Sequence, residues 1–82
     1  MQKSIFSNRY QLFISELVNI RKRKEMTQTM LAMELEKPQS FISKYERLER
    51  RLDIEEYLTI LETLVADADM ELLRILRKIR NT

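Results

Sequence analysis

The 82-residue sequence contains no cysteine and no histidine. It therefore has no thiolate nucleophile, no disulfide, no Cys/His zinc site and no imidazole base. The five methionines are interpreted as core residues rather than metal ligands. Carboxylates cluster near Asp53, but a helix cap explains them better than catalysis does. We therefore expect no enzyme, no bound metal and no cofactor.

Long apolar runs are also missing. No stretch approaches the roughly 18 residues that a membrane-spanning helix needs, and the first ten residues lack the apolar centre of a signal peptide. We therefore expect a cytoplasmic protein that makes no contact with a membrane. A chain of this length has room for one hydrophobic core, so we expect residues 1–82 to form a single domain.

Glycine is absent and there is a single proline, whereas residues that favour helices are abundant. These features predict an all-α fold. Thr27 is a good N-cap, Pro38 favours a helix start, and Asp53 and Glu56 have the spacing of a capping box. Together with the apolar periodicity, these signals predict five helices, at about residues 8–24, 28–35, 39–47, 54–64 and 70–78, the last of which can extend a little beyond residue 78.

The charges are strongly segregated along the chain. Residues 52–69 carry six acidic side chains and no basic one, whereas residues 70–82 carry four basic side chains and one acidic one. A wholly acidic stretch is repelled by phosphates. We therefore expect residues 52–69 to face away from any bound nucleic acid.

Residues 26–64 closely resemble the lambda-repressor-like (Cro-type, Xre) family of helix-turn-helix proteins. With the preceding helix, the resemblance covers residues 9–64, roughly two-thirds of the chain. It implies a compact five-helix DNA-binding domain in which the second and third helices form the helix-turn-helix. The elements that carry the resemblance are Thr27-Gln28, Leu31-Ala32, Glu36-Lys37-Pro38, Gln39-Ser40, Ile42-Ser43 and Glu46.

The expected third helix has the two faces that groove recognition requires. Ile42 and Tyr45 form an apolar inner face, and the outer face is polar. Glutamine can pair with adenine, lysine can donate to guanine, and serine can bind a base or a phosphate. The resemblance assigns contacts with DNA bases to Gln39, Ser40, Ser43 and Lys44.

Contacts with the DNA backbone are expected around this helix. The positions that match the family's backbone contacts are Gln28, Arg47, Arg50 and Arg51. Phe41 leans outward, where it can cover a sugar-phosphate stretch or touch a thymine methyl. Phe41 has the alternative of a half-buried ring on the domain's own surface, and the arginines have the alternative of a solvated surface.

The resemblance also implies a structural ion pair. Arg21 in the first helix corresponds to an arginine that pairs with the glutamate found here as Glu46. Such a pair ties the first helix to the recognition helix.

The sequence departs from the family at three helix ends. Members commonly have glycine where this chain has Glu25, Glu36 and Leu48. A residue with a side chain incurs about 1–2 kcal/mol in a left-handed conformation. Either these turns adopt another geometry or the domain tolerates the strain.

Residues 65–82 lie outside the matched segment and are expected to hold a dimerisation helix. In a homodimer, this basic helix can contact the acidic fourth helix of the second copy. The alternative is that the last helix packs on its own core. The apolar residues expected at the interface are Leu72, Leu73, Leu76 and Ile79.

The sequence therefore predicts a sequence-specific transcriptional regulator, a repressor or autoregulator, that binds double-stranded DNA as a homodimer. A second hypothesis is a protein-binding module, such as the antitoxin of a toxin-antitoxin pair, in which the acidic stretch or the last helix binds a small protein partner.

Overall fold

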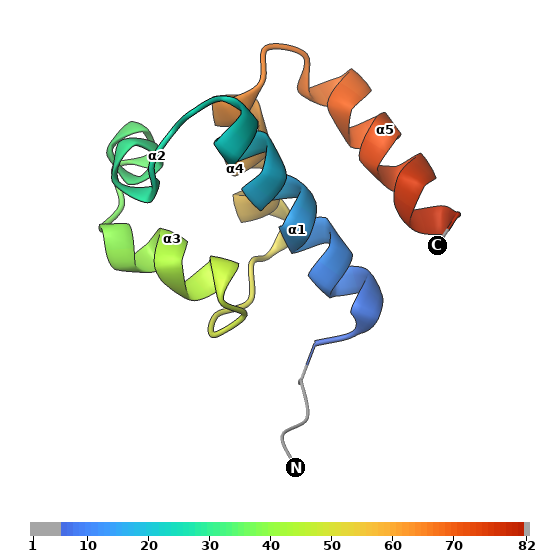
Figure 1. Cartoon of the computed structure of the whole chain (residues 1–82), viewed down its shortest axis with the longest axis horizontal. Helices are drawn as coiled ribbons and strands as arrows, with labels where there is room; N and C mark the ends of the chain where they lie inside the picture. Colours follow the sequence, from blue (N-terminus) through green and yellow to red (C-terminus); the bar gives the residue numbers. More distant parts are fainter. Residues whose placement is uncertain (1–5, 82) are drawn as a thin grey trace.

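The computed structural model describes residues 6–81, and this part of the chain is helical without any strand. The helices are α1 (Asn8–Arg23), α2 (Gln28–Leu35), α3 (Gln39–Glu46), α4 (Ile54–Leu64) and α5 (Ala68–Arg80) (Figure 1). The all-α, five-helix prediction is confirmed. The predicted bounds of α2 and α4 are correct, but α5 begins at Ala68, two residues earlier than predicted.

The helix starts show why these bounds were accessible from sequence. The Thr27 hydroxyl accepts a hydrogen bond from the Met30 N–H at 3.0 Å. At the start of α4, Asp53 and Glu56 form the reciprocal capping box, with the Glu56 N–H donating to Asp53 at 2.7 Å. Asp67 caps α5, and its position explains why this helix begins at Ala68.

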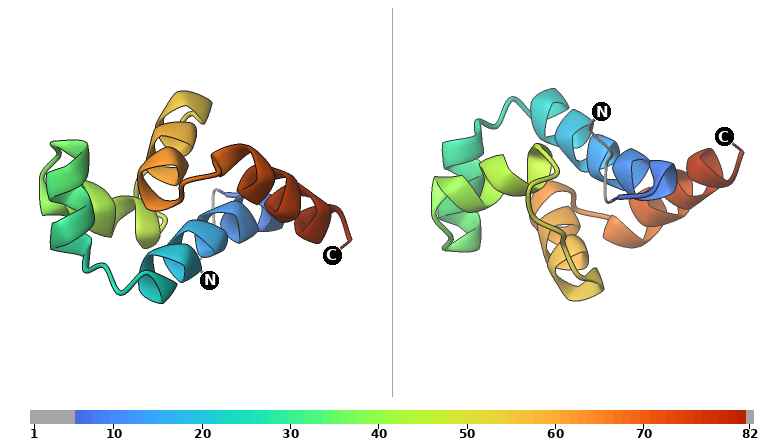
Figure 2. Two further views of the ribbon diagram at one scale, coloured as in Figure 1. Left: turned by 90° about the horizontal axis from the view of Figure 1, so that it is seen from above. Right: turned by 90° about the horizontal axis from the view of Figure 1, so that it is seen from below.

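The helices are arranged around one core. In both views of Figure 2, α2 and α3 lie at one end of the molecule and α5 at the other, with α1 and α4 between them. Residues of all five helices are buried in the core. The inner face of α4 differs from its predicted pattern, since Ile60 is buried whereas Leu58 is only half-buried. The fully buried large side chains are Tyr45, Ile14, Leu17, Ile20, Leu31, Ile42, Ile60, Leu61 and Ile75.

Helix α5 packs on its own core, which corrects one part of the predicted dimer interface. Ile75 is 0% exposed and Ile79 is 4% exposed, so Ile79 is not available to a second copy. Leu72 packs partly against the core, and Leu73 and Leu76 remain exposed. The sequence predicted one apolar stripe of Leu72, Leu73, Leu76 and Ile79. The helix is turned so that its two isoleucines, Ile75 and Ile79, face inward.

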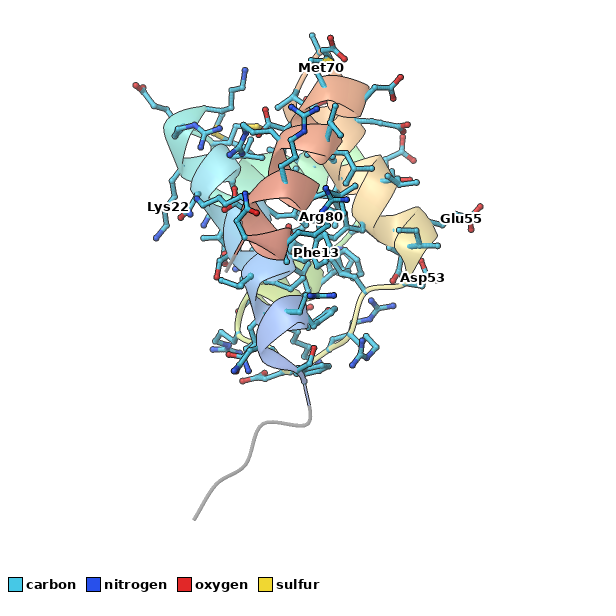
Figure 3. The ribbon with its side chains drawn as sticks, turned by 90° about the vertical axis from the view of Figure 1, so that its right-hand side faces the viewer. Phe13, Lys22, Asp53, Glu55, Met70 and Arg80 are labelled. Atoms are coloured by element: carbon cyan, nitrogen blue, oxygen red, sulfur yellow. The ribbon has the colours of Figure 1, made fainter. Side chains whose placement is uncertain are left out.

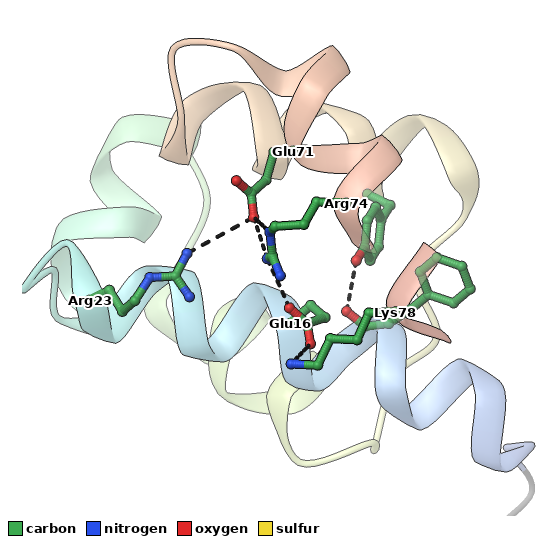
Figure 4. A network of polar contacts seen from close by, with 7 residues as sticks. Glu16, Arg23, Glu71, Arg74 and Lys78 are labelled. Atoms are coloured by element: carbon green, nitrogen blue, oxygen red, sulfur yellow. Dashed lines mark hydrogen bonds and ion pairs between the residues drawn. The ribbon is translucent and has the colours of Figure 1, made fainter. Parts of the chain in front are cut away.

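A polar clamp also holds α5 on α1 (Figure 4). The Glu16 carboxylate, on α1, is nearly buried and pairs with Arg74 at 3.0 Å and with Lys78 at 2.9 Å. Arg74 also pairs with Glu71 on its own helix. Burial raises the pKa of Glu16, but the hydrogen bonds and charges of Lys78 and Arg74 outweigh it and hold that pKa below its usual value. The clamp therefore contains an ionised carboxylate.

Three helix ends are left-handed at residues with side chains. The φ angles are 57° at Glu25, 56° at Glu36 and 63° at Leu48. At each end, the following N–H reaches back across the last turn, as in the 2.9 Å bond from Lys37 to the Ala32 carbonyl. The sequence left two alternatives, another turn geometry or tolerated strain. The positive φ angles show that the domain tolerates the strain.

Replacing Glu36 with glycine should therefore stabilise the protein. Glycine avoids a cost of about 1–2 kcal/mol at positive φ, while its greater freedom in the unfolded chain offsets about 0.5–1 kcal/mol of this gain. We expect a net rise of about 0.5–1 kcal/mol, or roughly 2–8 °C in melting temperature. Glu36→Ala is the control, because it keeps the Cβ. Equal melting temperatures for the two variants would contradict the prediction. Leu48→Gly should gain less, since the Leu48 side chain packs against the core.

Candidate nucleic-acid interface

Helix α3 presents a polar face to solvent because its apolar face is fixed in the core. Ile42 and Tyr45 are both 0% exposed. On the opposite side Gln39, Ser40 and Lys44 are exposed, and Ser43 is half-buried at the edge. The four residues assigned to base contacts therefore come from one solvent-facing part of this helix.

The ion pair between Arg21 and Glu46 is present and joins α1 to α3. The Arg21 Nε donates to Glu46 Oε2 at 2.7 Å, and a second guanidinium nitrogen donates to Oε1 at 3.0 Å. Both side chains are less than one-tenth exposed. Arg21 also donates to the Met26 carbonyl at 2.8 Å. This pairing with two parallel bonds fixes the orientation of α3 against α1.

Two glutamines continue the polar contacts from Glu46 to the surface. The Gln28 side-chain nitrogen donates to Glu46 Oε1 at 2.8 Å. The Gln39 side-chain nitrogen then donates to Gln28 Oε1 at 2.6 Å. Sequence reasoning missed these bonds, because residues 11 and 18 positions apart show no periodic signal. They meet only because α2 and α3 pack at a steep angle.

Phe41 is half-buried and has two cations near its ring. Its ring is half-buried against the core and makes an edge contact with Tyr45, with centroids 5.7 Å apart. The Lys37 ammonium lies 5.4 Å and the Arg50 guanidinium 4.8 Å from the ring centroid. The assignment of Phe41 to the DNA backbone therefore stays a prediction, and the two cations over the half-buried ring favour the alternative of packing on the domain's own surface.

Arg50 is held by an acidic partner. It donates to both carboxylate oxygens of Glu56, at 3.1 and 2.9 Å. The hydrogen bond from Arg50, and then the backbone bond from Asp53, hold the pKa of Glu56 below its usual value. Glu56 therefore lies against the loop that follows α3. That residues 52–69 face away from bound nucleic acid stays a prediction.

Arg47 and Arg51 are more accessible. Arg47 makes an exposed ion pair with Glu49 at 3.2 Å. The Arg51 guanidinium lies 4.9 Å from the Phe6 ring centroid and 4.5 Å from that of Tyr10. An arginine on an aromatic face keeps its N–H edge available for a phosphate. The arginines after α3 thus differ in their partners within the protein. Arg50 makes two hydrogen bonds with Glu56, whereas Arg47 makes one exposed ion pair.

Charged side chains elsewhere project in different directions. Figure 3 shows Lys22, on α1, and Glu55, on α4, on opposite sides of the molecule.

Within residues 6–81, no cluster of carboxylates suits a metal ion. In the same range, no helix is long and apolar enough to cross a bilayer.

Comparison with known proteins adds one finding. The model of a family described as helix-turn-helix matches residues 17–64. No curated protein and no solved structure matches the chain. The matched range starts within α1 and ends with the last residue of α4. It therefore contains all residues predicted to contact DNA and leaves out α5.

Proposed function

Since the chain belongs to the lambda-repressor-like helix-turn-helix family of DNA-binding regulators, we propose that it is a sequence-specific transcriptional regulator that inserts α3 into the major groove. The observation that carries this proposal is the polar outer face of α3, backed by buried Ile42 and Tyr45. The nearly buried ion pair of Arg21 and Glu46 ties this helix to α1. A helix held in this way, with exposed hydrogen-bonding groups, suits direct reading of base edges.

The residues proposed to read bases are Gln39, Ser40, Ser43 and Lys44. Glutamine matches the paired donor and acceptor of adenine, and the lysine ammonium can donate to guanine O6 and N7. The serines can donate or accept over a short reach. These side chains give the helix both base-specific and adaptable contacts.

The backbone contacts are proposed for Gln28, Arg47 and Arg51. Gln28 uses one N–H on Glu46 and keeps the second for a phosphate oxygen. Arg47 and Arg51 supply positive charge beside α3. Arg50 contributes less in this proposal, because Glu56 already neutralises it. DNA binding of this kind can block a promoter by itself. We therefore propose that the protein acts as a repressor or autoregulator.

Two alanine variants separate base reading from backbone binding. Lys44→Ala should relax the preference at one base pair of the selected DNA site. Arg51→Ala should weaken binding to all sequences alike and flatten the salt slope by about one unit. The measurement is selection from random DNA, followed by titration at several salt concentrations. An unchanged motif for Lys44→Ala would show that this residue does not read a base.

A homodimer is the assembly that we propose for DNA binding. Leu76 lies beside an apolar groove of about 340 Å³, which α4 borders with Ile54. Leu73 and the mostly exposed Ile54 lie outside the core. Outside the clamp with α1, acidic Asp69 lies in the first turn of α5, and basic Arg77 and Arg80 lie in its last turn. Two antiparallel copies of α5 would place opposite charges together, and this complementarity favours a second copy as the partner.

Leu76→Glu should abolish this dimer, because it places a charge in the apolar groove. Light scattering at tens of micromolar should give a dimer for the wild type and a monomer for the variant. Met70→Glu is the control, since Met70 is exposed on the same helix and outside the groove. A wild-type monomer, both with and without DNA, would contradict the dimer. In the dimer, the two recognition helices should lie about 34–36 Å apart.

The antitoxin hypothesis and the cytoplasmic location stay predictions. Copurification of the protein with a small protein partner would favour the antitoxin role over a regulator that acts alone.

A further inference from the structure

Glu56, at the start of α4, makes two separate contacts. Its Oε1 accepts the Asp53 N–H at 3.0 Å, which completes the capping box. Its two carboxylate oxygens also accept hydrogen bonds from Arg50, at 3.1 and 2.9 Å. Glutamine serves as well as glutamate at this position of a capping box. The box therefore requires an acceptor at residue 56 but not a negative charge, and the charge acts on Arg50.

Arg50 lies close to the recognition helix and can be reached from solvent. It belongs to the loop after α3, and its guanidinium is 4.8 Å from the ring centroid of Phe41, a residue of α3. The Arg50 side chain is 41% exposed. A phosphate that approaches Arg50 also approaches the negative charge of Glu56, which repels it. The carboxylate and a backbone phosphate therefore compete for the same guanidinium.

A second cation lies near the same carboxylate. Lys37, between α2 and α3, has its ammonium 5.4 Å from the Phe41 ring centroid. Lys37, Phe41 and Glu56 border one pocket of about 260 Å³. The hydrogen bond from Arg50 is the main cause of a lowered pKa at Glu56, and the charge of Lys37 lowers that pKa further. Glu56 therefore stays ionised and offsets positive charge beside the recognition helix.

We infer that Glu56 limits the affinity of the protein for DNA, because it holds Arg50 in an ion pair that competes with a backbone phosphate. Glu56 is a positioning residue, since it acts through Arg50. A phosphate contact adds affinity for every DNA sequence, so this restraint keeps binding to unrelated DNA weak.

The inference rests on the proposed function, in which the loop after α3 lies on the DNA backbone. It goes further by assigning an opposing role to an acidic residue of α4. Under this inference, Glu56 is an exception to the prediction that residues 52–69 face away from nucleic acid.

Glu56→Gln should strengthen DNA binding by about three- to tenfold at low salt. The amide oxygen still accepts the Asp53 N–H, so the capping box is kept, whereas the charge that neutralises Arg50 is lost. The gain should be similar for the selected DNA site and for an unrelated duplex. One added phosphate contact steepens the salt slope by about 0.9, so the gain should shrink roughly three- to fourfold between about 50 and 200 mM salt.

Glu55→Gln is the matched control, because it removes the same charge from the neighbouring residue. Glu55 is exposed, and Figure 3 shows its side chain pointing away from the body of the molecule. This variant should change affinity by less than about twofold, since exposed charges at a distance are screened by salt.

A double variant, Arg50→Ala with Glu56→Gln, shows whether the gain depends on Arg50. It removes one positive and one negative charge, so the net charge equals that of the wild type. Affinity and salt slope should return to near their wild-type values. The single and double variants together therefore distinguish a released arginine from a general loss of acidity.

The measurement is titration of each protein with both duplexes at several salt concentrations, after thermal unfolding has shown that each variant is folded. The inference is wrong if Glu56→Gln binds no more tightly than the wild type, if Glu55→Gln gains as much, or if the double variant keeps the gain. The proposed function fails separately, if the wild type selects no motif from random DNA.

Discussion

Replacing Glu46 with alanine should lower the free energy of unfolding by about 3–5 kcal/mol. The variant leaves the Arg21 guanidinium, which is nearly buried, without its carboxylate partner. It also removes the acceptor of the Gln28 hydrogen bond. Since small domains have a total stability of about 5–15 kcal/mol, chemical denaturation should show a large shift in midpoint.

Two further variants show whether this loss arises from the buried charge. Glu49→Ala removes an exposed ion pair with Arg47 and should cost less than about 1 kcal/mol. Replacing the buried pair by apolar residues, as in Arg21→Met with Glu46→Leu, should recover much of the lost stability. Equal losses for Glu46→Ala and Glu49→Ala would show that the pair does not stabilise the fold as its burial indicates.

Replacing Ile75 with alanine should cost about 2–5 kcal/mol, because the deleted atoms leave a cavity in the core. Ile75 is 0% exposed and joins α5 to the rest of the domain. The matched control is Met70→Ala on the same helix, where an exposed side chain should change stability by less than about 0.5 kcal/mol. Similar midpoints for both variants in chemical denaturation would mean that α5 is not part of the core.

The sequence predicted the elements whose ends carry local signals. Thr27 and Asp53 have side-chain caps that operate within three residues, so the starts of α2 and α4 were accessible without tertiary information. The resemblance likewise implied the pair between Arg21 and Glu46 over 25 positions. Local chemistry and family pattern therefore covered most of the helix-turn-helix.

The parts that the sequence could not predict depend on how helices pack together. Helix α5 has apolar residues on more than one side, and periodicity alone did not show that Ile75 and Ile79 face inward while Leu76 faces out. The position of the Phe41 ring also depends on packing, since Tyr45 and cations from two loops lie against it. Tertiary contacts decided these positions.

In the site, the clearest example of a contact that the sequence could not predict is the hydrogen bond between Gln39 and Gln28. Each residue was expected to contact DNA separately, with Gln28 on the backbone and Gln39 on a base. Their bond to one another, and the bond from Gln28 to Glu46, required the crossing of α2 and α3 to be known. The structure thus changes two independent contacts into one coupled unit.

Selection of bound sequences from random DNA is the most direct test of the claim that α3 reads the major groove. The wild type should enrich one roughly palindromic motif. A variant with alanine at residues 39, 40, 43 and 44 should retain only weak, salt-dependent binding with no motif. The claim would be contradicted if the wild type enriched no motif, or if the variant enriched the same one.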